Sequence, residues 1–341
     1  MNKPRYSEKR YLSNYELSLD FFNEAGIKVN DITPLRKVFL LNTDEGNKIL
    51  KRVDYGENRL KFVNNIVDEI RKEDKNVMSF YKFPDGKTYK LWKGSYYVIM
   101  DLIDGREASF TNPIEVNMCA ESLANMHMAS KKVVKNSNLE NKLDISFSEK
   151  VKNSLYELKE IKKLIGLYKF RNEFDEIFYK NIDTYIEEVN NVNEEIKNIK
   201  YEEYRDSLKN VVICHNDLAQ HNFIYNNNNM YLIDFDYSSV DLRVMDIADI
   251  ILKGIKNAAF DVYKSIELVK SYDKVYKIDD YEYKLIYILL SYPRDILTLG
   301  RSYYFKQKNW DYDVFLNRLN MKIENDNFRK VFLKKFKEKL I

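Results

Sequence analysis

The residues that could do chemistry are concentrated in one stretch, residues 211–236, which reads VVICHNDLAQHNFIYNNNNMYLIDFD. It contains Asp217, Asn222 and Asp234, whose oxygen-bearing side chains stand beside short apolar runs. A carboxylate can accept the proton of an attacking hydroxyl group, and carboxylate and amide oxygens are ligands that Mg²⁺ prefers. These residue types fit transfer of a phosphoryl group from a nucleotide to a hydroxyl group. The alternative is a polar turn in which Asp217 and Asn222 only cap backbone groups.

The spacing of these residues favours the chemical interpretation. Kinases carry the pattern H-R-D-L-x-x-x-N followed by D-F-G. Four positions here match the first part, namely His215, Asp217, Leu218 and Asn222. Asp234-Phe235-Asp236 then follows twelve residues after Asn222. A match of this kind is seldom accidental, so we expect Asp217 to face the acceptor while Asn222 and Asp234 converge on one metal ion.

The first hundred residues have the pattern of a small sheet with one helix. Short β-rich runs occupy residues 27–32, 36–43, 47–53, 79–83, 88–92 and 96–103. Between the third and fourth runs, apolar side chains recur at helical spacing over residues 57–72. The predicted order is therefore three strands, one helix, and two or three further strands.

Beyond residue 104 the pattern changes to long segments with a 3.6-residue period. Helices are predicted over residues 114–131, about 148–165, and 170–198, and further helices over the last hundred residues. The 213–236 loop, with its two short apolar strands, interrupts them. The sequence thus predicts an α+β protein with two lobes, an N-terminal nucleotide-binding lobe over 1–103 and a larger, mostly helical lobe over 104–341.

Composition narrows the class of partner. The 341 residues carry 56 Lys and Arg against 53 Asp and Glu, so the net charge of +3 gives no indication of nucleic-acid binding. No apolar run reaches the roughly 18 residues of a membrane span, and the first twenty residues lack the apolar core of a signal peptide. We therefore expect no membrane partner and synthesis in the cytoplasm. Cys119 and Cys214 predict neither a disulfide framework nor a metal knuckle.

The motifs resemble those of a known superfamily. HNDLAQHN followed by LIDFD is similar to the H-x-D-x-x-x-x-N and I-D-F/W-[DE] motifs of the aminoglycoside phosphotransferase and choline kinase superfamily. FIYNNNNMYLIDFDYSSVDLRVMDIADII and ILKRVDYGENRLKFV resemble the CotS family of bacterial spore coat proteins within it. This resemblance implies a protein-kinase-like two-lobed fold, ATP and Mg²⁺ as cofactors, and a small-molecule acceptor. It also implies a location in the spore coat, with other spore coat proteins as partners.

The resemblance also assigns roles to residues of the first lobe. Lys51, on the third strand, would bind the nucleotide phosphates, and the alternative is an edge-strand lysine in solvent. An acid of the following helix, Glu69 or Asp68 with Glu57 as a weaker candidate, would be its partner. The 101–103 segment would contact adenine through the backbone, which makes Asp101 and Ile103 binding candidates.

In the second lobe the resemblance implies that His215 and Asp246 support the catalytic loop. Asp246 is equally well placed as a helix N-terminal acid stabilised by the helix dipole. His127, alone in its predicted helix, is interpreted as a structural residue.

Two features depart from the kinase pattern. Only about ten residues separate Asp234 from the next helix, so the long activation segment that docks protein substrates is absent and a small hydroxyl-bearing acceptor is favoured. The turn predicted at residues 33–36 contains no glycine to bring backbone N–H groups close to phosphates, and Pro34 removes one donor. Arg36 could supply a phosphate-binding cation instead, or could be a surface arginine.

Three functions remain open from the sequence. The first is a small-molecule phosphotransferase in which Asp217 is the base. The second is a catalytically inactive protein that keeps the fold for assembly of the spore coat. The third and weaker one is an aminoglycoside or choline-type kinase, because the C-terminal region lacks the acidic cluster that a cationic acceptor would favour.

Overall fold

The computed structural model describes residues 17–35, 38–136, 145–207, 209–256 and 259–341. They form two compact units. Unit 1 consists of Met1–Ala108 and Gln220–Ser238, and unit 2 of Ser109–Ala219 and Ser239–Ile341. The predicted α+β class, with an N-terminal antiparallel sheet and a mostly helical remainder, is confirmed.

The division between the units differs from the expected boundary at residue 104. Strand β6 (Arg106–Glu107) pairs with β8 (Phe223–Asn226), which pairs with β9 (Asn229–Leu232), so this hairpin groups with the N-terminal residues. The Leu232 carbonyl also accepts from the Met78 N–H at 3.0 Å. The expected 213–236 loop is therefore split between the units. Residues 213–219 belong to unit 2, and residues 220–236 belong to unit 1 because their strands pair with N-terminal segments.

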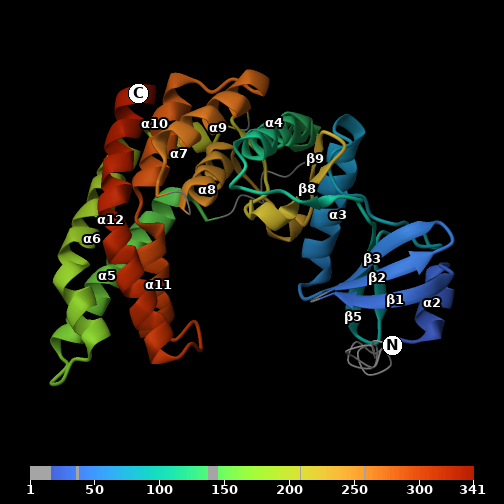
Figure 1. Cartoon of the computed structure of the whole chain (residues 1–341), viewed down its shortest axis with the longest axis horizontal. Coiled ribbons are helices and arrows are strands. Elements are labelled where there is room, and N and C mark those ends of the chain that lie inside the picture. The colour runs from blue at the N-terminus through green and yellow to red at the C-terminus, as the bar shows by residue number, and fades with distance from the viewer. Residues whose placement is uncertain (1–16, 36–37, 137–144, 208, 257–258) are drawn as a thin grey trace. The chain divides into compact units, whose positions relative to one another are not determined.

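Unit 1 is built on a five-stranded antiparallel sheet of order β1-β2-β3-β5-β4 (Figure 1). Its strands are β1 (Val29–Leu35), β2 (Val38–Thr43), β3 (Gly46–Val53), β4 (Lys90–Trp92) and β5 (Ser95–Asp101). The strand predicted at 79–83 is wrong. This segment makes a single bridge, from Phe80 to Met100, because β4 already pairs with the first part of β5 on that side.

The turn predicted at residues 33–36 is also wrong. Thr33, Pro34 and Leu35 belong to β1 and pair with Leu40, Phe39 and Val38 of β2. Pro34 is tolerated because β1 is an edge strand, where a missing backbone donor costs no ladder hydrogen bond. Arg36 lies outside the described residues.

The two faces of this sheet pack against different helices. Tyr97 and Ile99 share a buried cluster with Phe21 and Phe22 of α2 (Leu19–Ala25). Val98, which lies between them and points the other way, packs with Leu60 of α3 (Glu57–Glu73). The helix predicted at 57–72 is confirmed as α3.

Unit 2 begins with three long helices that confirm the predicted segments, namely α4 (Pro113–Asn136), α5 (Phe147–Gly166) and α6 (Glu173–Asn198). The third starts at residue 173 because Asn172 caps it, accepting from the Asp175 N–H at 3.0 Å. The remaining elements are α7 (Tyr201–Arg205), β7 (Val211–Cys214), β10 (Ser239–Leu242), α8 (Val244–Ile255), α9 (Val262–Val275), α10 (Asp280–Ser291), α11 (Arg294–Tyr304) and α12 (Tyr312–Leu340). Strands β7 and β10 pair antiparallel, and α4 packs against both β7 and α9.

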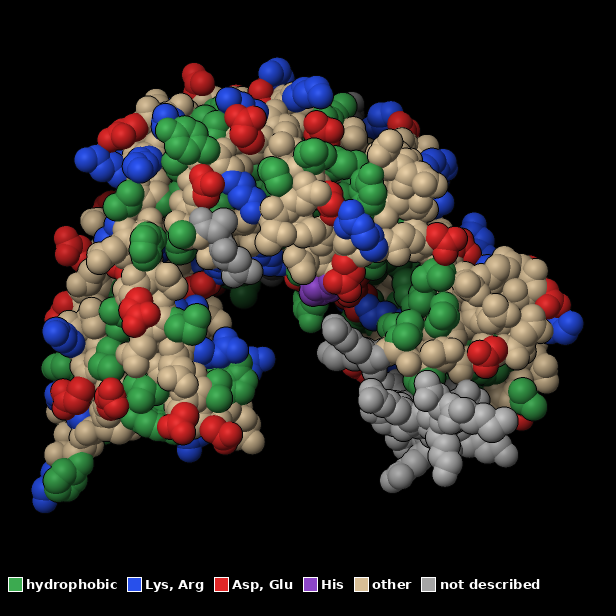
Figure 2. Space-filling model, viewed as in Figure 1, with side chains coloured by type: hydrophobic (Ala, Val, Ile, Leu, Met, Phe, Trp, Pro, Cys, Tyr) green, Lys and Arg blue, Asp and Glu red, His purple; other side chains and the backbone are tan. Residues whose placement is uncertain are grey.

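One face of the molecule shows charges of both signs on both units. Basic and acidic side chains are interspersed over the face drawn in Figure 2, in line with the small net charge. Within the described residues, no helix combines the length and apolarity needed to cross a membrane.

Candidate functional site

In unit 1 the side chain of Lys51 lies between two carboxylates. Its Nζ is 2.8 Å from Asp234 Oδ1 and 2.7 Å from Asp236 Oδ2. Lys51 pairs with Val98 across the sheet and therefore projects from the α3 face. Burial alone would lower the pKa of this lysine, but the two carboxylates outweigh burial and raise it. The ammonium group is thus held charged and in place.

Asp236 is fixed by two further groups of unit 1. The Tyr55 hydroxyl donates to its Oδ1 at 2.9 Å, and Arg59 donates to its backbone carbonyl at 2.7 and 3.2 Å. Burial and the adjacent carboxylate raise the pKa of Tyr55, so the hydroxyl stays protonated. In the sequence, Asp236 stands where the kinase motif D-F-G has glycine. The contacts of Asp236 with Lys51, Tyr55 and Arg59 were not predicted from the sequence.

The expected acidic partner of Lys51 on the helix is a wrong prediction. Glu69 forms an ion pair with Lys72, one turn along α3, and Glu57 accepts from Tyr89. Among the described residues, the ion-pair partners of Lys51 are Asp234 and Asp236 alone. The physical reason is that α3 presents Arg59, a cation, to this cluster, and the carboxylates come from the loop after β9 instead.

The two candidate metal ligands of unit 1 are neighbours at the end of one hairpin. The Asn222 carbonyl accepts from the Ile233 N–H at 2.9 Å, which continues the register that pairs Phe223 with Leu232. Asn222 is therefore opposite the residue that precedes Asp234. Asp234 has a left-handed backbone, with φ of 65°, a conformation that aspartate tolerates better than most residues. An amide and a carboxylate oxygen so placed are ligand types that fit Mg²⁺.

The segment expected to contact adenine already has partners within unit 1. Asp101 ends β5, its N–H donates to the Ser79 carbonyl at 3.3 Å, and its carboxylate accepts from Lys48 Nζ at 3.0 Å. The Leu102 N–H donates to Asn47. Ile103 follows and is half-buried. The backbone N–H of Asp101 is thus already used within unit 1, and the adenine contact of Asp101 and Ile103 stays a prediction.

In unit 2, Asp246 holds the backbone of the loop that carries Asp217. Its fully buried carboxylate accepts from the His215 N–H at 2.6 Å and from the Asn216 N–H at 2.9 Å. Burial would raise the pKa of Asp246, but the hydrogen bond from His127 and the other donors outweigh it, so the pKa is lowered. An ionised carboxylate therefore anchors the two residues just before Asp217, while Asp246 also stands in the first turn of α8.

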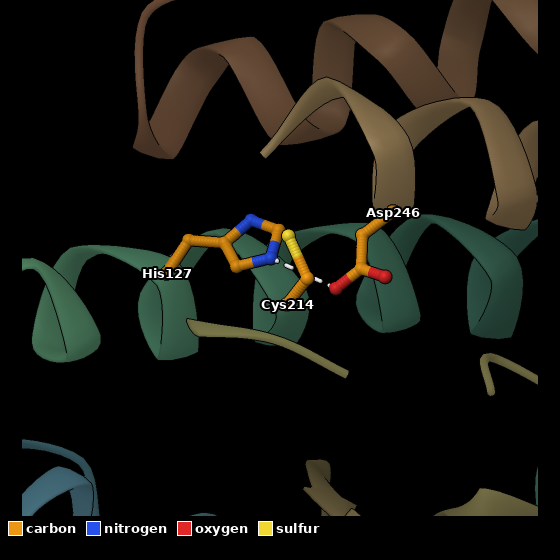
Figure 3. A group of neighbouring side chains, drawn as sticks. All are labelled: His127, Cys214 and Asp246. Carbon is orange, nitrogen blue, oxygen red and sulfur yellow. Dashed lines mark hydrogen bonds and ion pairs between the residues drawn. The ribbon is translucent and has the colours of Figure 1, made fainter. Parts of the chain in front are cut away.

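His127, Cys214 and Asp246 meet in the interior of unit 2 (Figure 3). Their ligand atoms are close enough for a metal ion, but each already has a hydrogen-bonding role. His127 Nε2 lies 3.1 Å from Asp246 Oδ2, His127 Nδ1 lies 2.7 Å from the Tyr272 hydroxyl, and Cys214 donates to the Leu242 carbonyl. Burial lowers the pKa of His127, so the neutral ring donates from Nε2 and accepts at Nδ1. The group is a structural brace, as the interpretation of His127 anticipated.

The candidate base Asp217 is part of a chain of charges in unit 2. Lys253 Nζ lies 3.0 Å from Asp217 Oδ1 and 3.0 Å from Asp249 Oδ2. Asp249 in turn accepts from Arg294 Nη2 at 2.8 Å. The role of Lys253 was not predicted from the sequence. The signal was present, since Asp246, Asp249 and Lys253 are charged residues at i, i+3 and i+7 of an otherwise apolar helix.

The structure thus brings the predicted residues together in two groups. Lys51, Asn222 and Asp234 meet in unit 1, and His215, Asp217 and Asp246 meet in unit 2. The family model for choline/ethanolamine kinase matches residues 80–253, which include most of both groups. The chain belongs to the choline/ethanolamine kinase family.

A spore coat protein is similar to most of the chain. Spore coat protein S of Bacillus subtilis (strain 168) is 20% identical over 307 residues, which cover 89% of this chain and 87% of that protein. The resemblance to spore coat proteins within the kinase-like superfamily is confirmed as a similarity of sequence.

Solved structures confirm the protein-kinase-like fold of this superfamily. An aminoglycoside phosphotransferase from Alicyclobacillus acidocaldarius superimposes with a TM-score of 0.84 at 15% identity, covering 95% of this chain and 96% of that one. Amicoumacin kinase hAmiN, solved with AMP-PNP, Ca²⁺ and amicoumacin, superimposes with a TM-score of 0.60 at 14% identity, covering 96% of each chain. At these identities the likeness concerns the fold.

Proposed function

We propose that this protein is an ATP- and Mg²⁺-dependent phosphotransferase that acts on a hydroxyl group of a small molecule. The observation that carries the proposal is the contact of the Lys51 ammonium group with Asp234, the second carboxylate of the motif pair. The nucleotide and divalent cation in the amicoumacin kinase structure, on the same fold, support the choice of cofactors.

On the nucleotide side, Lys51 would bind phosphate oxygens, and Asn222 and Asp234 would hold Mg²⁺. The metal, when bound, would neutralise negative charge on the phosphates. When the nucleotide binds, the Lys51 ammonium group would contact a phosphate oxygen in place of part of its contact with Asp234. Its position on the α3 face of the sheet supports this role. Asp236, with its bonds from Tyr55 and Arg59, keeps a second carboxylate beside Lys51 and limits its mobility.

On the acceptor side, Asp217 would take the proton of the attacking hydroxyl group. The hydroxyl oxygen forms a bond to the γ-phosphorus of ATP, the bond from that phosphorus to the β–γ bridging oxygen breaks, and ADP leaves with the electron pair. The proton passes to the Asp217 carboxylate and then to water. Asp246, through the N–H groups of His215 and Asn216, would fix the backbone that carries this base.

Calorimetric titration with MgATP, followed by measurement of ADP formation with a panel of hydroxyl compounds, tests the proposal. Asp217→Ala is expected to abolish transfer while MgATP affinity stays within a factor of two. Absence of both MgATP binding and turnover in the wild-type protein would refute it.

We further propose that the protein acts in the spore coat, because spore coat protein S is similar over 89% of the chain. A second candidate function follows from the same similarity, namely a catalytically inactive protein that serves coat assembly with other coat proteins. A spore-forming strain that carries Asp217→Ala separates the two. If the variant protein reaches the coat and the coat is normal, the assembly function is favoured, and a defective coat with normal localisation favours catalysis.

A further inference from the structure

Unit 2 contains a cavity of about 570 Å³ among helices α6, α8, α10, α11 and α12. This volume is in the range of small-molecule sites in proteins. Part of its wall is apolar, from residues such as Leu252, Leu290, Ile296 and Met321. The charged residues of the wall decide which small molecules it suits.

Cations outnumber carboxylates in this wall. Two carboxylates line it, Asp295 and Asp326, and five cations line it, namely Lys256, Arg294, Arg318, Lys322 and Arg329. Arg329 forms ion pairs with Asp326 and with Glu188, which does not line the cavity. Arg294 forms an ion pair with Asp249.

The three remaining cations are Lys256, Arg318 and Lys322. Among the described residues, Asp295 is the one carboxylate that forms ion pairs with any of them. Lys256 Nζ lies 2.8 Å from Asp295 Oδ1, and Lys322 Nζ lies 3.4 Å from Asp295 Oδ2. Burial alone would raise the pKa of Asp295, but the two lysines outweigh it and the pKa is lowered, so one negative charge serves two positive ones. Arg318 stacks 4.3 Å over the Trp310 ring and, within the described part of the chain, has no carboxylate partner. The wall therefore has surplus positive charge.

A series of ion pairs links the wall of this cavity to the candidate base. Leu252 of α8 and Lys256, which directly follows α8, line the cavity, and Lys253, next to Leu252 in the sequence, contacts Asp217. Lys253, in the last turn of α8, and Lys256, its C-cap, are three residues apart, the spacing of neighbours on one helix face. Arg294 of the wall binds Asp249, which binds Lys253, so a continuous run of charge contacts leads from the wall to Asp217.

We propose that this cavity binds the phosphate acceptor and that the acceptor is an anion, a small hydroxylated compound with a carboxylate or phosphate group. The inference rests on the proposed phosphotransferase function and names its substrate class. Arg318 and Lys322, four residues apart on α12, bind the anionic group, since a guanidinium fork suits carboxylate and phosphate oxygens. A hydroxyl group of the same molecule takes the phosphoryl group from ATP, and its proton goes to Asp217. Choline and polyamine antibiotics, which are cations, are disfavoured by the surplus positive charge.

Binding of matched compounds to the full-length protein tests the charge preference. Glucuronate and glucose differ by one carboxylate, glucose 6-phosphate provides the phosphate arm, and choline and spectinomycin provide the cations. We expect glucuronate or glucose 6-phosphate to bind at least tenfold more tightly than glucose. The anion that binds identifies whether a carboxylate or a phosphate is recognised. Failure of both anions to bind more tightly than glucose, or tighter binding of either cation, overturns the proposal.

Variants locate the binding to the cavity wall. Arg318→Met with Lys322→Met is expected to remove the tenfold preference, and Arg318→Gln with Lys322→Gln serves as a second test that keeps polar side chains. Lys334→Met, an exposed lysine of the same helix outside the cavity, should leave the preference unchanged. Anion binding that persists in both double variants overturns the assignment to this wall.

MgATP titrations on the same samples separate this inference from the proposed function. If the anions bind as expected but MgATP does not, the phosphotransferase function fails and the anion site stands. If MgATP binds and only neutral or cationic compounds are phosphorylated, the phosphotransferase function stands and the anionic acceptor is overturned.

Discussion

Lys51 Nζ lies 2.8 Å from Asp234 Oδ1, although 183 residues separate the two along the chain. Lys51 is on a strand of the sheet, and Asp234 is in the loop that follows the β8–β9 hairpin. The hairpin reaches this position through backbone pairing with β6 and with residues 76–78. One contact thus joins the lysine of the sheet to the second carboxylate of the sequence motif, and in the proposed function a nucleotide phosphate shares it.

Replacing Lys51 should weaken nucleotide binding. We expect Lys51→Met to raise the dissociation constant for MgATP at least tenfold, about 1.4 kcal/mol, because it removes the cation and leaves Asp234 and Asp236 to repel phosphate. Lys90→Met is the matched control, since Lys90 is on β4 of the same sheet but pairs with Glu24. Calorimetric titration measures both, and equal MgATP affinities for the two variants would contradict the role of Lys51.

Replacing Lys253 should lower turnover without affecting nucleotide affinity. Lys253→Met removes the ammonium group that lies 3.0 Å from Asp217 and holds its carboxylate in one orientation. We expect kcat to fall by about tenfold while KM for MgATP is unchanged, because misplacement of a catalytic group affects the chemical step. Lys253→Arg should restore part of kcat. Lys270→Met, which removes an exposed ion pair on α9, is the control and should leave kcat unchanged.

The buried pair of Arg205 and Asp241 should matter for stability more than a surface pair. Arg205 Nε lies 2.9 Å from Asp241 Oδ1, and both side chains are at most 6% exposed. Arg205→Met leaves a buried carboxylate without its cation, which costs about 3–5 kcal/mol. Lys28→Met, which breaks an exposed pair with Asp44, should cost no more than about 1 kcal/mol. Guanidinium denaturation compares the two, and a similar loss in both variants would contradict this prediction.

The buried His127 should make stability depend on pH. Its pKa in the folded protein is lowered from the ordinary value of 6.5, so the folded state favours the neutral ring. Stability is then complete above pH 6.5 and is lost as pH falls below it, because the unfolded chain takes up a proton that the folded one does not. The slope is at most about 1.4 kcal/mol per pH unit.

Denaturation of the wild-type protein at pH 7.5 and pH 5.5 should show this loss. His127→Gln has no group that titrates in this window and should show a smaller difference between the two pH values. An unchanged pH dependence in the variant would mean that other groups cause it.

Much of the fold was predictable because it depends on local patterns. The helical period over residues 57–72 gave α3, and the apolar stripe over 170–198 gave α6, whose start is fixed by the Asn172 cap. The strand predicted at 79–83 failed because its residues have β-type composition but only one bridge is available beside β5. Composition indicates that a segment can pair, and the neighbouring strands decide whether it does.

The candidate site was predictable to the extent that its residues are close in sequence. His215, Asp217, Asn222 and Asp234 follow a fixed spacing, so the sequence by itself determined their identity and predicted a class of chemistry. The partner of Lys51 could not be found in this way, and the candidates Glu69, Asp68 and Glu57 stand where the structure has Asp234 and Asp236. The charge of Lys253 on an otherwise apolar helix was visible in the sequence, but its contact with Asp217 depends on the fold.

The sequence alone therefore determined the family, the α+β class and the reactive groups, since these depend on residue types at short, regular spacings. Only the tertiary structure decided which charges meet, namely Lys51 with Asp234 and Asp236, and Lys253 with Asp217. The physical reason is that these pairs form between elements brought together by backbone pairing and core packing. A charged side chain can satisfy its electrostatic requirement with any opposite charge nearby, and which one is nearby is fixed by the fold.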